Sequence, residues 1–149
     1  MRIVFLHGLQ SSPDSCKRRL LENHGHEVYA PRLPPDDWDL SVLRAKNIIK
    51  TVDPDVVVGS SRGGAVAIAA RPNCPTVLVA PAWRKYCPWG TISATTQIIH
   101  SEADEVVNFD ESVALSHAFG ADLVEAGHDH RMNDADATTA LLRAIDKIA

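Results

Sequence analysis

Short runs of apolar and mostly β-branched residues recur along the chain, separated by longer segments of mixed polarity. Several of these runs are apolar without alternation, which is typical of strands that are covered on both faces in a parallel sheet. We therefore predict strands at residues 2–6, 27–30, 55–60, 75–80, 96–100 and 121–126.

The segments between these strands carry helix signals. Ser12 before Pro13 predicts an N-cap followed by proline at the first helical position, in a helix that ends near residue 23. Apolar residues recur at roughly helical spacing over residues 38–51, and Pro54 stops that helix. The alternation of strand and helix predicts an α/β fold with a mostly parallel sheet of about six strands and helices on both faces. Three further helices are expected at residues 63–70, 109–119 and 134–148.

Length and composition narrow the class of protein. A chain of 149 residues fits one domain better than two, so we expect a single domain over residues 1–149. Hydrophobic residues make up 45% and charged residues 23% of the chain, which is ordinary for a soluble globular protein. The net charge of −4 argues against nucleic acid or an acidic membrane surface as a partner.

The N-terminal segment and the cysteines indicate the compartment. The segment "MRIVFLHG" is too short for a signal peptide, and no apolar run approaches the ~20 residues of a membrane span. The cysteines, an odd number without CxxC spacing, are typical of unpaired thiols in a reducing environment. We therefore expect a cytoplasmic protein. The sequence does not give its oligomeric state.

The third predicted strand runs directly into the segment "GSSRGG", residues 59–64, which has the spacing G-x-S-x-G. A strand that turns straight into a helix forces its central residue into a strained backbone conformation and lifts that side chain clear of the sheet. Glycines on both sides have no Cβ to clash with the neighbouring strand and helix. The pattern predicts Ser61 as a nucleophile and the backbone N–H of Arg62 as an oxyanion donor.

A serine hydroxyl becomes a nucleophile when a base takes its proton and an acid orients that base. Asp104 lies in the loop after the fifth predicted strand and is the favoured acid, with Glu102 and Glu105 as alternatives. The loop after the sixth strand contains two histidines. We prefer His130 as the base because it has the longer reach, and His128 stays an alternative.

The first strand ends in "FLHG", residues 5–8. Gly8 permits a turn there, so the backbone N–H of Leu9 can be the second oxyanion donor, or that of Gln10 if the loop is shifted by one residue. His7 precedes the serine and is expected to be a structural hydrogen-bonding residue. The remaining histidines, His24, His26, His100 and His117, have no such context and are expected to be solvated or capping residues.

Six segments follow one another along the chain: "LHGLQSSPDSCK" (6–17), "PRLPP" (31–35), "VVGSSRGG" (57–64), "APA" (80–82), "SEADEVV" (101–107) and "EAGHDHRM" (125–132). In these segments, taken in this order, the chain resembles the α/β-hydrolase superfamily and, within it, the small YqiA-like bacterial esterases. The resemblance implies Ser61, Asp104 and His130 as a catalytic triad and an oxyanion hole near Leu9 and Arg62. The chain departs from the superfamily in lacking the first two of its usual eight strands and any insertion long enough for a lid domain.

The expected function is that of a serine hydrolase of carboxylesterase type, which acts on a small-molecule ester or thioester and uses no cofactor and no metal. An open pocket without a lid favours short acyl groups, and loops 31–39 and 81–95 are candidate walls. The pattern leaves two alternatives: a non-catalytic binding module with a hydrolase-like fold, and an anion-binding protein that uses the loop at residues 59–64.

Overall fold

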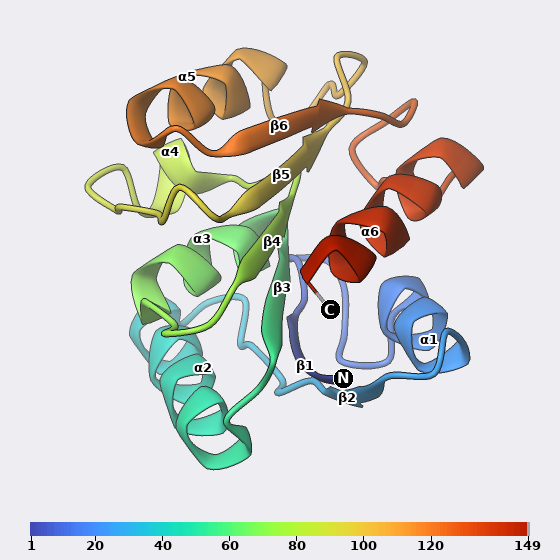
Figure 1. Cartoon of the computed structure of the whole chain (residues 1–149). Helices are drawn as coiled ribbons and strands as arrows, with labels where there is room; N and C mark the ends of the chain where they lie inside the picture. The colour runs from blue at the N-terminus through green and yellow to red at the C-terminus, as the bar shows by residue number, and fades with distance from the viewer. Residues whose placement is uncertain (149) are drawn as a thin grey trace.

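The computed structural model describes residues 1–148 and contains six parallel strands in the order β2-β1-β3-β4-β5-β6 (Figure 1). Ala149, the end of the predicted domain, lies outside the described residues. Each strand lies within its predicted range, so the prediction of an α/β fold with a parallel sheet is confirmed. The strands are β1 (Arg2–Leu6), β2 (Glu27–Tyr29), β3 (Val56–Ser60), β4 (Thr76–Val79), β5 (Gln97–His100) and β6 (Asp122–Glu125).

Helices cover both faces of the sheet (Figure 1). Two of them, α1 (Cys16–Asn23) and α6 (Ala135–Ile148), pack on one face. The other face is covered by α2 (Trp38–Val52), α3 (Arg62–Ala70), α4 (Trp83–Tyr86) and α5 (Phe109–Phe119).

The predicted start of α1 was wrong. The helix is capped by Ser15, whose Oγ accepts a hydrogen bond from Arg18 N, and Ser12 and Pro13 lie outside it. The reason is that residues 8–15 form a loop that borders a large cavity at the carboxyl ends of the strands, so the helix begins only after this loop. The short helix α4 was not predicted, because one turn without a side-chain cap leaves no periodic pattern in the sequence.

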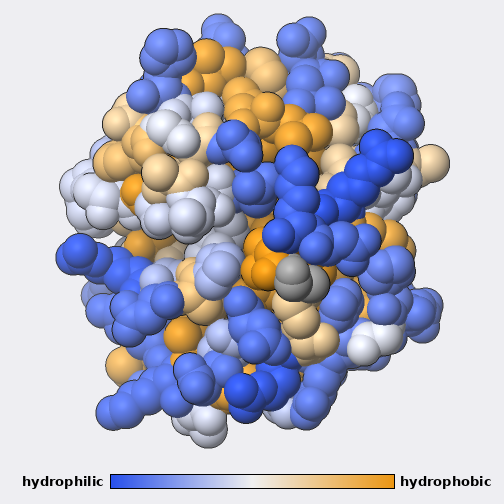
Figure 2. Space-filling model, in the orientation of Figure 1, coloured by the Kyte–Doolittle hydropathy of each residue, from blue (hydrophilic) through white to orange (hydrophobic). Residues whose placement is uncertain are grey.

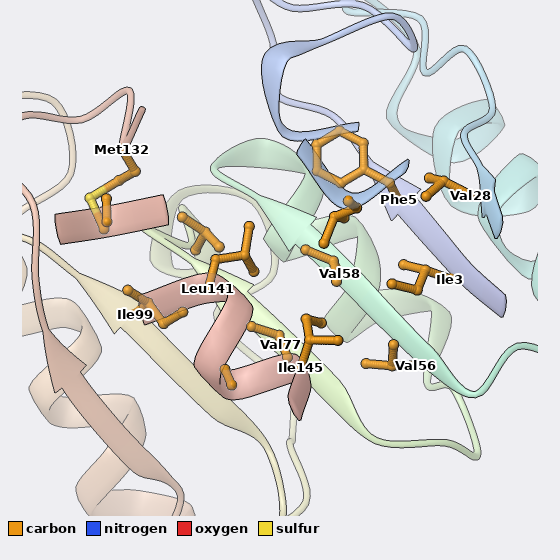
Figure 3. Close-up of a cluster of buried hydrophobic side chains, with 14 of the residues drawn as sticks. Ile3, Phe5, Val28, Val56, Val58, Val77, Ile99, Met132, Leu141 and Ile145 are labelled. Carbon is orange, nitrogen blue, oxygen red and sulfur yellow. The ribbon is translucent and has the colours of Figure 1, made fainter. Parts of the chain in front are cut away.

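The core consists of two clusters separated by the sheet. Successive residues of one strand belong to different clusters: Ile3 and Phe5 pack toward α1 and α6, whereas Val4 and Leu6 pack toward α2 and α3. Figure 3 shows the first cluster, in which Leu141 and Ile145 of α6 lie over the strands. Both faces of the four central strands, β1, β3, β4 and β5, are therefore buried, which is the physical reason for strands that are apolar without alternation. Burying each large aliphatic side chain contributes about 1.5–3 kcal/mol.

Hydrophilic residues cover most of the outer surface seen in Figure 2, with apolar residues scattered between them. None of the helices within residues 1–148 combines the length and the apolar composition that crossing a bilayer requires.

The strand order places a reversal between β1 and β3. The chain leaves β1 toward α1 on one face and leaves β3 toward α3 on the other, which opens a crevice at the carboxyl ends of these two strands. Helix α3 approaches β1 closely at this point: a Cβ added to Gly63 would lie 2.1 Å from the Leu6 carbonyl oxygen and 2.6 Å from that of His7. Only glycine fits this contact.

We expect Gly63→Ala to abolish or severely impair folding, because the new methyl group meets two backbone carbonyls that cannot move separately from the sheet. The loss should exceed the ~4 kcal/mol that marks an exceptional substitution. Chemical denaturation measures it. The matched control is Gly120→Ala at the end of α5, where φ is +69° and no heavy atom lies within 4 Å of the added Cβ. This control should cost only about 1–2 kcal/mol, and equal losses in the two variants would contradict the close contact.

Candidate active site

The strand-to-helix turn holds Ser61 in a strained conformation, with φ 56° and ψ −118°. Its neighbours fix this backbone from several sides. Ser61 N donates to the Val79 carbonyl at 2.9 Å, and its own carbonyl accepts from Ala82 N at 3.0 Å. A Cβ added to Gly59 would lie 2.5 Å from the Gly63 carbonyl oxygen, so the strand and the helix are in near contact across the turn. A strained residue of this kind persists only where its surroundings over-determine it.

The turn brings the Ser61 hydroxyl to an imidazole and a carboxylate from two later loops. Ser61 Oγ lies 2.8 Å from Nε2 of His130, and Nδ1 of the same ring lies 2.7 Å from Oδ2 of Asp104. Because the carboxylate accepts the Nδ1 proton, Nε2 is left to accept the proton of the Ser61 hydroxyl. A hydroxyl, an imidazole and a carboxylate bonded in this order can turn an alcohol into a nucleophile.

Asp104 has no exposed side-chain surface and four hydrogen-bond donors. Burial by itself raises the pKa of this carboxyl group. Hydrogen bonds from His100 and His130, and from the backbone amides of Val106 and Val107, outweigh burial and hold the pKa well below its usual range. The group is therefore an ionised acceptor for the imidazole of His130.

The loop that carries His130 is anchored by its neighbours. The side chain of Met132 is buried in the cluster shown in Figure 3, although its backbone has a positive φ of 56°. Asp129 accepts a hydrogen bond from Met132 N. From α1, the ammonium group of Lys17 donates to the Arg131 carbonyl and to Asn133 Oδ1, and burial lowers the pKa of this lysine to about 8. These contacts fix the position of the imidazole over Ser61.

The alternative residues lie elsewhere. His128 is mostly exposed and pairs with Asp136 at 3.3 Å. The backbone N–H of Glu102 donates to Glu125, and Glu105 is an exposed residue at the rim of the cavity. Of the two histidines and three acidic residues considered from the sequence, the structure brings only His130 and Asp104 to Ser61.

One group of side chains has the spacing of metal ligands. Ligand atoms of His128, Asp134 and Asp136 lie within 4.8 Å of one another on the surface. The two carboxylate oxygens of Asp134 already accept backbone N–H groups of His128 and Ala137. The group shares no residue with the hydrogen-bonded chain from Ser61 to Asp104.

His7 organises the loop after β1, which borders Ser61. Its Nε2 accepts from Leu33 N at 2.9 Å, so Nδ1 carries the proton and donates to the Gly8 carbonyl at 2.8 Å. Burial lowers the pKa of His7, which keeps the ring neutral for these two roles. With the Gly8 carbonyl held, the trans peptide directs the N–H of Leu9 to the opposite side. None of the hydrogen bonds within residues 1–148 uses that N–H.

The N–H of Arg62 is the first of α3, and the first N–H groups of a helix have no partner inside it. The arginine side chain turns away into the core, where it is 2% exposed and donates to the Pro34 carbonyl and Ser41 Oγ. Its guanidinium group lies over the stacked rings of Trp38 and Tyr86. Arg62 thus has two separate roles: its backbone N–H lies at the cavity, and its buried guanidinium group connects α3 to α2.

One buried residue of the site was not predicted from the sequence. His100, which we expected to be solvated or to cap a helix, is fully buried at the end of β5, and its Nε2 lies 2.9 Å from Asp104 Oδ2. The signal that could have found it is its position, since it ends a strand four residues before the favoured acid.

Ser61 opens into a cavity of about 1150 Å³. Its walls come mainly from the loop at residues 8–15 and the first turn of α1, from residues 103–107 and from residues 128–133. No residue of loop 31–39 lines it, and loop 81–95 contributes Ala82, Lys85 and Tyr86. The expected wall at residues 31–39 was therefore wrong, because Leu33 is buried in the core and His7 holds its backbone.

A comparison with protein families matches residues 3–85 to the alpha/beta hydrolase family, which is more than half of the chain. The chain therefore belongs to this family. The narrower resemblance to YqiA-like esterases stays a prediction. Among curated proteins no significant match was found.

Solved structures of the same fold cover nearly the whole chain. A hydrolase of the alpha/beta superfamily from Xanthomonas campestris has a TM-score of 0.76 at 21% identity, covering 99% of this chain and 96% of its own. The ydeN gene product of B. subtilis has a TM-score of 0.74 at 15% identity, covering 97% and 98%. An esterase domain from Rhodothermus marinus has a TM-score of 0.72 at 16% identity, covering 99% and 85%. At these identities the likeness concerns the fold.

The strain at Ser61 predicts an unusual order of stabilities. Ser61→Gly and Ser61→Ala both remove the hydroxyl, but only glycine removes the Cβ that makes φ 56°, ψ −118° unfavourable. Relief of about 1–3 kcal/mol exceeds the entropy cost of up to about 1 kcal/mol that glycine adds in the unfolded chain. We expect Ser61→Gly to be the more stable variant by about 1 kcal/mol in urea denaturation. A more stable alanine variant would show that the turn is not strained.

Proposed function

We propose that the protein is a serine hydrolase that cleaves small carboxylic esters or thioesters through an acyl-enzyme intermediate. The observation that carries the proposal is the hydrogen-bonded chain from Ser61 Oγ through His130 to the buried Asp104. Membership of the alpha/beta hydrolase family supports it, as does the name of the Rhodothermus marinus neighbour, an esterase domain.

In this proposal Ser61 Oγ attacks the ester carbonyl while Nε2 of His130 takes its proton. The imidazolium that forms is stabilised by the ionised Asp104 at Nδ1. His130 then gives the proton to the leaving alcohol or thiol, and the acyl group stays on Ser61. A water molecule, deprotonated by the same imidazole, then attacks the acyl carbonyl, and the imidazolium returns its proton to Ser61 Oγ as the carboxylic acid leaves.

Two backbone groups beside Ser61 are proposed to hold the oxyanion, the N–H of Leu9 and the N–H of Arg62. The Leu9 donor is supported by the hydrogen bond from His7 to the Gly8 carbonyl, which fixes the peptide plane before substrate binds. A Cβ added to Gly8 would lie 3.5 Å from Ser61 Cβ, so this peptide is next to the nucleophile. Losing one donor of this kind costs about 2.7–4 kcal/mol of transition-state stabilisation in comparable sites.

The exposed rim of the cavity, rather than its volume of about 1150 Å³, supports small substrates. Two apolar side chains at its rim, Leu9 and Val106, are 39% and 73% exposed. An acyl chain that extends past them would lie in water, where additional CH₂ groups gain no burial.

The first test is covalent labelling. We expect a fluorophosphonate probe to label the wild-type protein at Ser61, and p-nitrophenyl acetate to be turned over. Ser61→Ala should lose labelling and at least about 10⁴-fold in kcat, because nucleophilic attack is removed. Mass spectrometry locates the label, with Ser60→Ala as the neighbouring control. An inert wild-type protein would contradict the proposal and favour a binding module. Sulfate or phosphate bound at residues 59–64 without labelling would favour an anion site.

The second test is a series of p-nitrophenyl esters of increasing acyl length. We expect kcat/KM to stop rising beyond about butyrate, because the rim offers no further buried apolar surface. A closed apolar pocket would instead raise kcat/KM by about fourfold for each CH₂, from ~0.8 kcal/mol of burial. A continued rise up to laurate would contradict the small-substrate part of the proposal and leave the serine chemistry intact.

A further inference from the structure

We propose that His100 is a positioning residue that fixes the carboxylate of Asp104 for His130, so that two imidazoles share one carboxylate oxygen and only one of them reacts. The inference rests on the proposed function and adds to it a residue outside the chain from Ser61 to Asp104. His100 touches neither Ser61 nor the cavity, and it acts through Asp104.

The contacts of the Asp104 carboxylate come from two kinds of partner. Oδ1 accepts the backbone N–H groups of Val106 and Val107, each at 2.8 Å, from the same loop as Asp104 itself. These bonds shape the loop but move with it. Oδ2 accepts from His130 at 2.7 Å and from His100 at 2.9 Å. No other titratable side chain of residues 1–148 hydrogen-bonds this carboxylate.

His100 is the contact that connects the carboxylate to the sheet. It is the last residue of β5 and is paired in register with Glu125 of β6. Its side chain is fully buried against Phe109 at the start of α5, and its Nδ1 lies 2.7 Å from Ser112 Oγ of the same helix. The ring therefore cannot rotate away. Because β5 pairs with β4 and β4 pairs with β3, the sheet fixes the position of Oδ2 relative to the strand that leads into Ser61.

The surroundings of His100 assign its proton. Nε2 faces two acceptors, Asp104 Oδ2 and the Val107 carbonyl oxygen at 3.1 Å, so it carries hydrogen. Nδ1 then accepts the hydroxyl proton of Ser112. His130 has the opposite arrangement, with its proton on Nδ1 and a free lone pair on Nε2 directed at Ser61. The two rings therefore have different tasks, because only His130 presents a bare nitrogen to the cavity.

Removal of the His100 donor changes both the position and the hydrogen bonding of the carboxylate. Oδ2 keeps one partner, the carboxylate gains freedom to rotate, and the imidazole of His130 is less often aligned with Ser61. Misplacement of a catalytic group by about 1 Å can cost about 10²-fold in rate. A less solvated carboxylate also attracts the proton of His130 more strongly, which moves the acid limb of kcat/KM to higher pH.

The experiment compares two substitutions of equal length, His100→Met without a donor and His100→Gln with one. We expect His100→Met to lose about 10- to 100-fold in kcat with little change in KM, and to show the displaced acid limb. His100→Gln should keep kcat within about threefold and retain the wild-type pH profile. Ile98→Met, also fully buried in β5, controls for general disturbance of the strand and should leave kcat within about twofold. Equal losses in His100→Met and His100→Gln, or a wild-type profile in both, would overturn the proposal.

A measurement on the unaltered protein keeps the proposal testable if His100→Met does not fold. We expect heteronuclear NMR to show a slowly exchanging imidazole proton on Nε2 of His100, and its resonance should move in Asp104→Asn. A bare Nε2, or a resonance indifferent to Asp104→Asn, would overturn the inference. Fluorophosphonate labelling distinguishes failure of the proposed function from failure of this inference. An unlabelled wild-type protein would contradict the proposed function. A labelled wild-type protein together with unchanged kcat and pH profile in His100→Met would contradict only the inference about His100.

Discussion

The backbone bend at Ser61 is the constraint on which the rest of the structure depends. It holds a side chain at a positive φ of 56°, and it does so because β3 and α3 meet at glycines too close for any larger residue. The same contact presses α3 against the end of β1. One feature therefore sets the packing of helix on sheet, directs the hydroxyl outward and leaves the first N–H of the helix beside it.

The Ser61 hydroxyl by itself is a weak nucleophile. His130 and Asp104 reach it from two later loops, and residues from other parts of the structure hold these loops in place. The loop of His130 is fixed by Met132 in the core and by Lys17 from α1. Asp104 is fixed by two backbone amides and two imidazoles. Burial of a charged carboxylate is tolerated here because every hydrogen bond it needs is present. Order in these loops thus depends on the sheet and on α1.

Two histidines that stand outside the chain from Ser61 to Asp104 have similar structural tasks on opposite sides of Ser61. His7 accepts a backbone N–H with one nitrogen and orients the Gly8 peptide with the other. His100 bonds a hydroxyl of α5 and orients a carboxylate. In both cases a buried ring at the end of a strand transmits the rigidity of the sheet to a group in a loop. In the proposed reaction, preorganisation of this kind would support electrostatic stabilisation of the transition state without reorganisation of the site.

Local sequence determined the elements of this protein, apart from the one-turn helix α4 and the start of α1, and it determined the strand-to-helix turn. Apolar runs marked every strand, the four central ones covered on both faces, and the spacing of Gly59, Ser61 and Gly63 marked the bend, which contacts from neighbouring segments hold in place. Only the tertiary structure decided between His128 and His130, since both lie in one loop and differ in which contacts hold them. It also decided the place of His100, because a strand-end histidine shows its partner only after the following loop has folded back over it.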